Sequence, residues 1–207
     1  GGASLAALSD DWSSLREKAQ NCQACDLCRG RTTVVFGDGD TNADLMFIGE
    51  APGYHEDQSG RSFIGPAGQL LTRMIKAMQF DRESVYVTHI VKCRPPSSRT
   101  PVPVETSACL PYLNRQIELV SPKVLVLLGA VPANVLLGAA AISGVRGKWQ
   151  EYNGLAVMPT YHPSYLLRSP KRKKLVWEDL QLVMRRLGKD PAETLQKMKH
   201  GSSHQGQ

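Results

Sequence analysis

The sequence of 207 residues lacks any apolar run that approaches the roughly 20 residues needed to cross a bilayer. Its first residues also lack the charged and then apolar pattern of a secretory signal peptide. No internal repeat is present, and the composition gives no sign of a second domain. We therefore expect a cytoplasmic protein with no membrane partner and one globular domain at 12–188, flanked by a disordered N-terminus at 1–11 and a C-terminal tail at 189–207.

Acidic side chains are in the minority, because 19 Asp and Glu stand against 25 Lys and Arg. The resulting net charge of +6 favours polyanionic partners over acidic substrates, although it is also compatible with an ordinary soluble protein. Nucleic acid is the polyanion that this charge favours first.

Cysteines are few, five in all, and in an intracellular chain they are better metal ligands than disulfide partners. Cys22 and Cys25 form a C-x2-C pair with Cys28 close behind, and Cys93 and Cys109 follow much later. The first three lie in a polar stretch that offers no core, so burial as small hydrophobic residues is the less favoured interpretation. A metal or cluster site is predicted, and the spacing leaves tetrahedral zinc and an iron–sulfur cluster both open.

Apolar strands alternate with helices along the chain, which predicts an α/β fold. The fold class expected is a three-layer α/β/α sandwich around a central, mainly parallel four-stranded sheet. The strands are expected at 44–49, 85–91, 123–129 and 155–160. The helices are expected at 12–20, from Pro66 onward, and at about 104–120, 132–138 and 175–187.

Three unusual loops follow these strands. The first is a Gly/Pro elbow crowded with acids that starts at Gly49, the second is the proline-rich stretch 92–103, and the third is the segment 161–174. Because the carboxyl ends of parallel strands line one crevice, we expect the three loops to converge on one site.

The motifs in these loops carry a resemblance: GEAPG-x2-ED at 49–57, AGQLL at 67–71, VKCRPP-x2-R-x-P at 91–101 and HPSYLLR at 162–168. With them the chain resembles the family-4 iron–sulfur uracil-DNA glycosylases from about Cys22 to Leu187. The resemblance implies a DNA-repair hydrolase that cleaves the N-glycosidic bond of uracil and leaves an abasic site. It also implies a 4Fe-4S cluster on Cys22, Cys25, Cys93 and Cys109, with Cys28 as an extra thiol. We expect a monomer that acts on uracil in single- and double-stranded DNA at the nucleoid.

Such an enzyme flips a nucleotide out of the stack and stabilises negative charge on the departing base. Phe63 is the candidate for stacking on that base, and a neutral His162 is the candidate donor to uracil O2, as in an oxyanion hole. Glu50 is the candidate for orienting the attacking water or fixing the base edge. Each has a structural alternative: a core Phe, a capping His and an exposed loop Glu.

The elbow supplies further candidates for base binding. Ala51 stands where more distant glycosylases carry an acid, so no strong general base is evident. Gly53 is expected to pack on the base, and Glu56 to crowd C5 and exclude the thymine methyl. Asp57 is a candidate helix or loop cap with no assigned role.

Cations beside apolar residues predict the DNA-binding surface, with a solvated charged face as the alternative. The expectation is that the leucines enter the duplex while the cations hold phosphates. The residues are Arg94, Arg99, Leu166, Leu167, Arg168, Lys171 and Arg172, continued by Lys173 and Lys174.

The chain departs from the family at residue 89, where His stands in place of the usual Asn. Because Asn offers a donor and an acceptor to the uracil edge in another geometry than imidazole, strict uracil specificity comes into question. His89 is a candidate both for base binding and for catalysis, through retention of uracil, a shift toward another deaminated base, or capture of the sugar. The alternative functions are an iron–sulfur DNA-damage-binding protein with low turnover and a redox protein, and the latter leaves the HPS motif unexplained.

Overall fold

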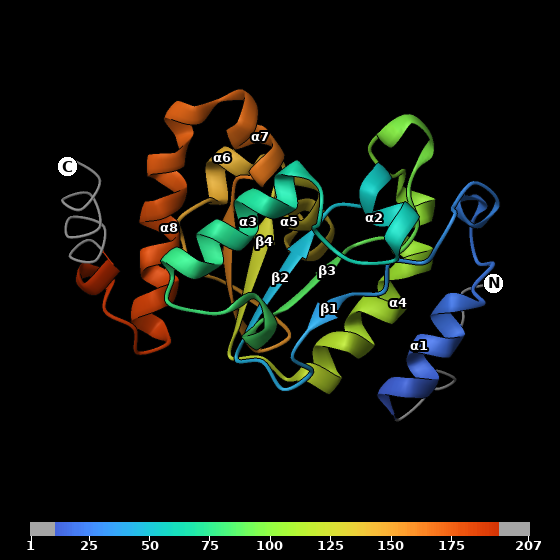
Figure 1. Cartoon of the computed structure of the whole chain (residues 1–207), viewed down its shortest axis with the longest axis horizontal. Coiled ribbons are helices and arrows are strands. Elements are labelled where there is room, and N and C mark those ends of the chain that lie inside the picture. Colours follow the sequence, from blue (N-terminus) through green and yellow to red (C-terminus); the bar gives the residue numbers. More distant parts are fainter. Residues whose placement is uncertain (1–10, 195–207) are drawn as a thin grey trace, which may run out of the picture.

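The computed structural model describes residues 11–194, and a six-stranded sheet forms the centre of that range (Figure 1). The strands are β1 (Asp38–Gly39), β2 (Leu45–Gly49), β3 (Tyr86–His89), β4 (Val124–Leu128), β5 (Gln150–Tyr152) and β6 (Leu155–Thr160). They are arranged in the order β1-β3-β2-β4-β6-β5, in which β3, β2, β4 and β6 are parallel and the two edge strands are antiparallel. The four parallel strands are those predicted, and the expected count of four is corrected to six by the short edge strands.

Helices connect the parallel strands, as the alternating pattern predicted. They are α1 (Trp12–Gln20), α2 (Tyr54–Ser59), α3 (Pro66–Ala77), α4 (Pro103–Val120), α5 (Ala130–Leu137), α6 (Ile142–Val145), α7 (Pro163–Arg168) and α8 (Lys173–Arg186). Short 3-10 turns lie at Asp26–Arg29, Arg82–Ser84, Pro96–Ser98 and Pro170–Arg172. Pro66 stands in the first turn of α3, where its missing N–H costs no hydrogen bond.

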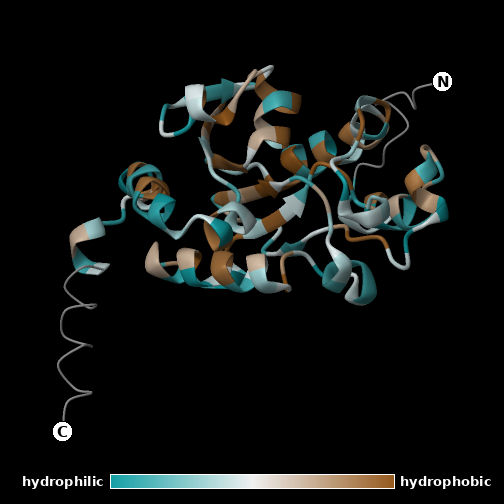
Figure 2. Ribbon diagram, turned by 90° about the horizontal axis from the view of Figure 1, so that it is seen from above, coloured by the Kyte–Doolittle hydropathy of each residue, from teal (hydrophilic) through white to brown (hydrophobic). Residues whose placement is uncertain are grey.

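Alternate residues of the buried strands face opposite layers of helices, because side chains along a strand alternate between its faces. Phe47 of β2 packs in the core that α3, α7 and α8 cover, and Ile48 packs in the core that α1, α4 and α5 cover. Figure 1 shows α3 and α8 on one side of the sheet and α4 and α1 on the other. In Figure 2 the hydrophobic colours gather on the central strands. The three-layer class is therefore confirmed.

The ends of the domain differ in part from the expected boundaries. Asp11, expected in a disordered segment, accepts a hydrogen bond from Ser14 N at 2.9 Å and caps α1. Thr194, expected in a tail, donates from its hydroxyl to the carbonyl of Ala77 at 2.8 Å at the end of α3. Ordered contacts therefore extend beyond 12–188, while the remaining tail residues, 1–10 and 195–207, lie outside the described range.

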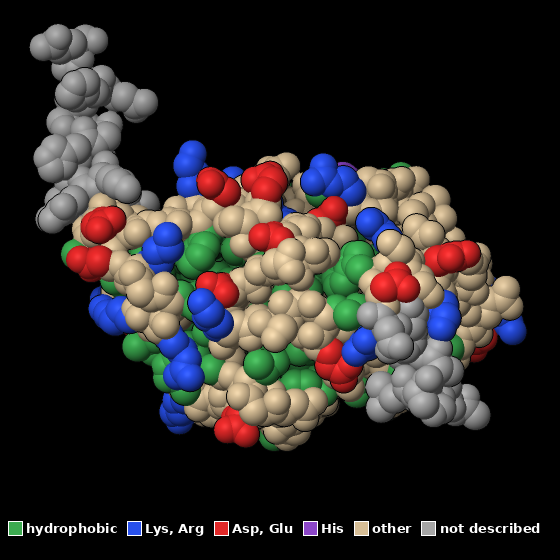
Figure 3. Space-filling view, turned by 90° about the horizontal axis from the view of Figure 1, so that it is seen from below, with side chains coloured by type: hydrophobic (Ala, Val, Ile, Leu, Met, Phe, Trp, Pro, Cys, Tyr) green, Lys and Arg blue, Asp and Glu red, His purple; other side chains and the backbone are tan. Residues whose placement is uncertain are grey.

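The face at the amino ends of the parallel strands carries both signs of charge. Figure 3 shows blue and red side chains interspersed there among green ones. Within residues 11–194, no helix has the length and apolarity that crossing a membrane requires.

Candidate active site

The predicted convergence of loops is present, because one cavity of about 360 Å³ is lined by residues from all three. Glu50 and Gly53 come from the loop after β2, His89 ends β3, and His162 follows β6. The cavity also has a fourth wall, at Gly129 after β4, that sequence reasoning missed. The site thus lies at the carboxyl ends of all four parallel strands.

Gly129 is required at this wall for two reasons. Its φ of +101° is a conformation that residues with a side chain rarely adopt, and an added Cβ would lie 3.1 Å from the Cβ of His162. The glycine therefore lets the end of β4 approach the histidine closely. Its position directly after an apolar strand was the available sequence signal.

The ring of His162 is fixed by the turn that it caps. Its Nδ1 accepts from the backbone N of Ser164 at 3.1 Å and lies 2.7 Å from the Ser164 hydroxyl. Because Nδ1 is the acceptor, the proton of the neutral ring is on Nε2. Burial, and then the charge of Arg168, lowers the pKa of His162 to about 4, so the ring is neutral at neutral pH. The residue is both a helix cap and a neutral N–H donor.

Glu56 holds the turn that positions Phe63. One carboxylate oxygen accepts from Ile64 N at 2.9 Å and Gly65 N at 2.8 Å, and the other accepts from Gly53 N at 3.1 Å. Phe63 itself has a φ of +54°, which is costly for a residue with a side chain and persists only where its surroundings hold it. The carboxylate therefore lies in the pocket wall with both oxygens already bonded to backbone.

Phe63 lies in the cavity wall, but one face of its ring is covered by another side chain. The imidazole of His89 stacks on it with the centroids 4.6 Å apart and the planes 4° from parallel. His89 is 2% exposed, and burial, together with the charge of Lys92, lowers its pKa well below 6.5. The His89 ring is therefore neutral at neutral pH.

The remaining elbow residues have distinct surroundings. Ala51 and Gly53 both line the cavity. Burial raises the pKa of Glu50, and a hydrogen bond with Thr100 opposes that rise. Asp57 lies outside the cavity lining and accepts from Thr32 N at 2.9 Å, which ties α2 to the segment after the first cysteines.

Of the two leucines that were expected to enter the duplex, one is buried and one is exposed. Leu166 is 1% exposed and packs in the core under α7, so its assignment as a DNA-contacting residue is wrong. Leu167, the next residue along the helix, is 44% exposed, and Arg168 is exposed beside the cavity that it helps to line. The other cations of the run are exposed as well: Lys171, Arg172, Lys173 and Lys174.

The two arginines of the proline-rich loop have partners within the protein. Arg99 forms a two-pronged ion pair with Glu105, at 2.6 and 2.8 Å, while it lines the cavity. The guanidinium of Arg94 lies 5.3 Å from the ring centroid of Tyr54, which is 57% exposed. Sequence reasoning missed Tyr54, whose position next to Gly53 was the signal.

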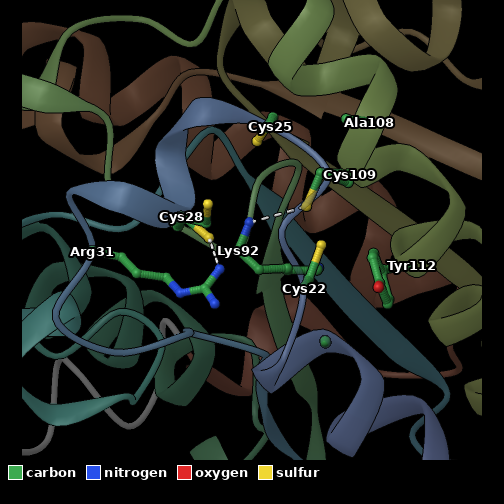
Figure 4. Close-up of a pocket in the computed structure, with 11 residues that line it drawn as sticks. Cys22, Cys25, Cys28, Arg31, Lys92, Ala108, Cys109 and Tyr112 are labelled. Atoms are coloured by element: carbon green, nitrogen blue, oxygen red, sulfur yellow. Dashed lines mark hydrogen bonds between the residues drawn. The ribbon is translucent and has the colours of Figure 1, made fainter. Parts of the chain in front are cut away.

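All five cysteines line a second cavity, beside α1 and α4. Figure 4 shows the sulfur atoms of Cys22, Cys25, Cys28 and Cys109 around a common space. Arg31 donates to the sulfur of Cys93 at 3.2 Å, and the backbone N of Lys92 donates to the sulfur of Cys109 at 3.3 Å. In the described part of the chain no group of three or more His, Cys, Asp or Glu side chains is arranged as a ready metal site.

The residues around this second cavity nevertheless fit a thiolate-bound cluster. Metal binding requires thiolates, and N–H donors to sulfur stabilise the negative charge that they carry. Burial raises the pKa of Cys109 to about 12 and also raises that of Cys93, and the bonds from Lys92 N and Arg31 to these sulfurs oppose that rise. The donor set is sulfur throughout, and Arg31 supplies a cation beside it.

Lys92 lines the cysteine cavity and is bonded to His89, which lines the other cavity, and sequence reasoning gave it no role. Its Nζ donates to the hydroxyl of Thr88 and to the carbonyl of His89, both at 2.7 Å, and burial of the side chain lowers its pKa to about 7. The available signal was the position of this lysine between a buried strand and a cysteine. A lysine buried there needs hydrogen-bond acceptors close by.

The sequence was also compared with known proteins. The sequence profile of the Uracil DNA glycosylase superfamily matches residues 36–181. The chain is 43% identical over 170 residues to a type-4 uracil-DNA glycosylase of Thermotoga maritima, covering 80% of this chain and 88% of that relative. It is 40% identical over 184 residues to one of Sulfurisphaera tokodaii, covering 84% of each chain. A type-5 uracil-DNA glycosylase of Pyrobaculum aerophilum is 32% identical over 170 residues, covering 73% of this chain and 74% of that relative.

Proposed function

Because the chain belongs to the uracil-DNA glycosylase superfamily, and within it to the type-4 family, we propose that it removes uracil from DNA by hydrolysis of the N-glycosidic bond. The observation that carries the proposal is the state of His162. A neutral ring with its proton on Nε2 lies in the wall of a cavity at the carboxyl ends of the strands. That cavity is the place where a flipped base is expected.

Charge stabilisation by His162 accounts for the chemistry. As the bond to the sugar lengthens, electrons move onto the uracil ring, and an N–H donor at O2 stabilises the resulting anion. The ring of His162 does not have to lose its proton, because it donates a hydrogen bond only. One such donor contributes on the order of 3 kcal/mol to the transition state.

The other residues of the elbow position the reactants. Glu50 is proposed to orient the attacking water, and its partly buried carboxylate lies in the cavity wall. Gly53 leaves room for the base plane, and Ala51 contributes no carboxylate at its own position in the wall. Glu56 is proposed to lie beside C5 and exclude the thymine methyl, while it holds the Phe63 turn.

The proposed partner is uracil-containing DNA, single- or double-stranded, bound by a monomer at the nucleoid of the cytoplasm. Leu167 and Arg168 are exposed next to the cavity, and the cations that follow in the chain extend that surface. Arg94 and Arg99 are proposed to contact phosphate from the opposite loop. Arg94 would then do so alongside the exposed ring of Tyr54.

A 4Fe-4S cluster is proposed as the cofactor, held by Cys22, Cys25, Cys93 and Cys109, with Cys28 as a spare thiol on the same cavity. Bound there, it supplies a crosslink between the first cysteine segment and the loop after β3. Arg31 and the backbone N of Lys92 would donate to two of the sulfurs that hold it, those of Cys93 and Cys109. We propose a structural role for the cluster. It would fix the loop after β3 at Cys93, and the same loop lines the base cavity a few residues later.

The test is single-turnover release of base from a single-stranded oligonucleotide that contains one uracil. We expect His162→Ala to slow release by about a hundredfold while DNA affinity stays nearly unchanged, because the donor acts on charge that develops in the transition state. His55→Ala is the matched control, since His55 is exposed and does not line the cavity, and its rate should stay within about twofold. No release by the wild-type protein would refute the proposal.

A further inference from the structure

The imidazole of His89 stands where an aromatic base would stack. Its plane is within 4° of the plane of Phe63, with the centroids 4.6 Å apart. This is the offset parallel arrangement that stacked aromatic rings prefer. Phe63 is only 5% exposed, so its ring has little other surface to offer a base.

Both rings rest on Gly49 at the end of β2. A Cβ built there would lie 2.5 Å from Cζ of Phe63 and 3.1 Å from Cδ2 of His89. The Phe63 side of the pair is further held by the turn that Glu56 bonds. Both rings therefore pack against the backbone of Gly49, and the turn that Glu56 bonds holds Phe63 in place.

Volume does not limit the entry of a base. The cavity of about 360 Å³ has room for a pyrimidine, and the ring of His162 lies 5.7 Å from that of Phe63 at a tilt of 35°. The missing element is a free aromatic face. The Nδ1 of His89 is buried and has no hydrogen-bond partner among the described residues, so moving the ring breaks no bond at that atom.

We infer that His89 weakens base binding by occupying the face of Phe63 that the base must use. This inference rests on the proposed glycosylase function and names the residue that limits its substrates. A planar base enters only when the imidazole leaves Phe63, so every base loses part of its affinity to that displacement.

The experiment measures equilibrium binding of free uracil, and of a single-stranded oligonucleotide with a tetrahydrofuran abasic analogue that brings no base to the pocket. We expect His89→Ala and His89→Asn to bind uracil at least tenfold more tightly than wild type. Their affinity for the abasic oligonucleotide should be unchanged, because that probe does not need the face of Phe63. His89→Phe keeps an aromatic ring on Phe63 without a nitrogen, so it should bind uracil as weakly as wild type.

The outcomes separate this inference from the proposed function. Unchanged or weaker uracil binding by both His89→Ala and His89→Asn would overturn the inference, and weaker binding would make His89 a direct ligand of the base. Tight uracil binding by His89→Phe would also overturn it, because the blocking ring would then be without effect. Absence of base release by every variant, with the binding order intact, would count against the glycosylase and leave the occupied face established. Circular dichroism and iron content of each variant confirm that the folds compared are the same.

Discussion

Replacing Glu56 by Gln is expected to destabilise the protein and misplace Phe63. The carboxylate accepts three backbone hydrogen bonds, from Gly53, Ile64 and Gly65. A glutamine keeps one acceptor oxygen, which can retain the Ile64 and Gly65 pair, but it turns an NH2 group toward the N–H of Gly53. Since a hydrogen bond to a charged group contributes about 1.5–3 kcal/mol, the free energy of unfolding should fall by about 2–3 kcal/mol.

The assay is urea unfolding at pH 7, followed by circular dichroism, together with single-turnover base release. Glu118→Gln is the control, because Glu118 is 57% exposed in an ion pair with Arg115, and its loss should cost less than about 0.5 kcal/mol. Base release by Glu56→Gln should drop about tenfold, since the turn that holds Phe63 at positive φ is weakened. A stability loss no larger than that of the control would refute the reasoning that these hydrogen bonds hold the turn.

Three further predictions concern acid, cysteine and salt. The pKa of His162 is about 4 when folded and 6.5 when unfolded, so stability should fall as pH drops from 6.5 toward 4, by up to about 3 kcal/mol; His162→Ala should remove that part in acid-unfolding curves. Cys109→Ala should lose iron and the broad absorbance near ~400 nm of a thiolate-bound cluster, whereas Cys28→Ala should keep both; stoichiometric zinc without iron in anaerobic protein would contradict the cluster. Alanine at four cations should lower the slope of log affinity against log salt for duplex DNA by about 0.9 for each phosphate that the protein no longer neutralises, and an unchanged slope would make them a solvated face. The four are Lys171, Arg172, Lys173 and Lys174.

The sequence predicted the parallel strands because each is an apolar run with a helix after it, and the site because three unusual loops follow those runs. The edge strands β1 and β5 were not counted in the predicted sheet because they are short and polar and form only by pairing with β3 and β6. Leu166 was assigned to the surface because a charged neighbourhood does not show which side of a short helix faces inward. Adjacent residues of a helix point about 100° apart, so one leucine packs inside and the next is exposed.

Contacts between residues distant in sequence explain the rest of what was missed. The stack of Phe63 on His89 depends on β2 and β3 lying side by side. The residue types at positions 63 and 89 do not show that the two rings meet. The hydrogen bonds that Glu56 accepts from backbone N–H groups come from a turn eight and nine residues further along the chain. Motifs therefore located the pocket, but they did not show which of its side chains are already engaged.

The hydrogen bonds of Lys92 connect the two cavities, so substitutions on either side are expected to influence the other. One short stretch of backbone supplies a donor to the sulfur of Cys109 and, through the ammonium, two hydrogen bonds to Thr88 and to the carbonyl of His89. Substitutions on the two sides should then show effects on stability that do not add in a double-mutant cycle, although the two cavities share no lining residue within 11–194. Evolution of a new base preference at residue 89 is constrained for the same reason, because any variant there has to keep its carbonyl in place for the ammonium.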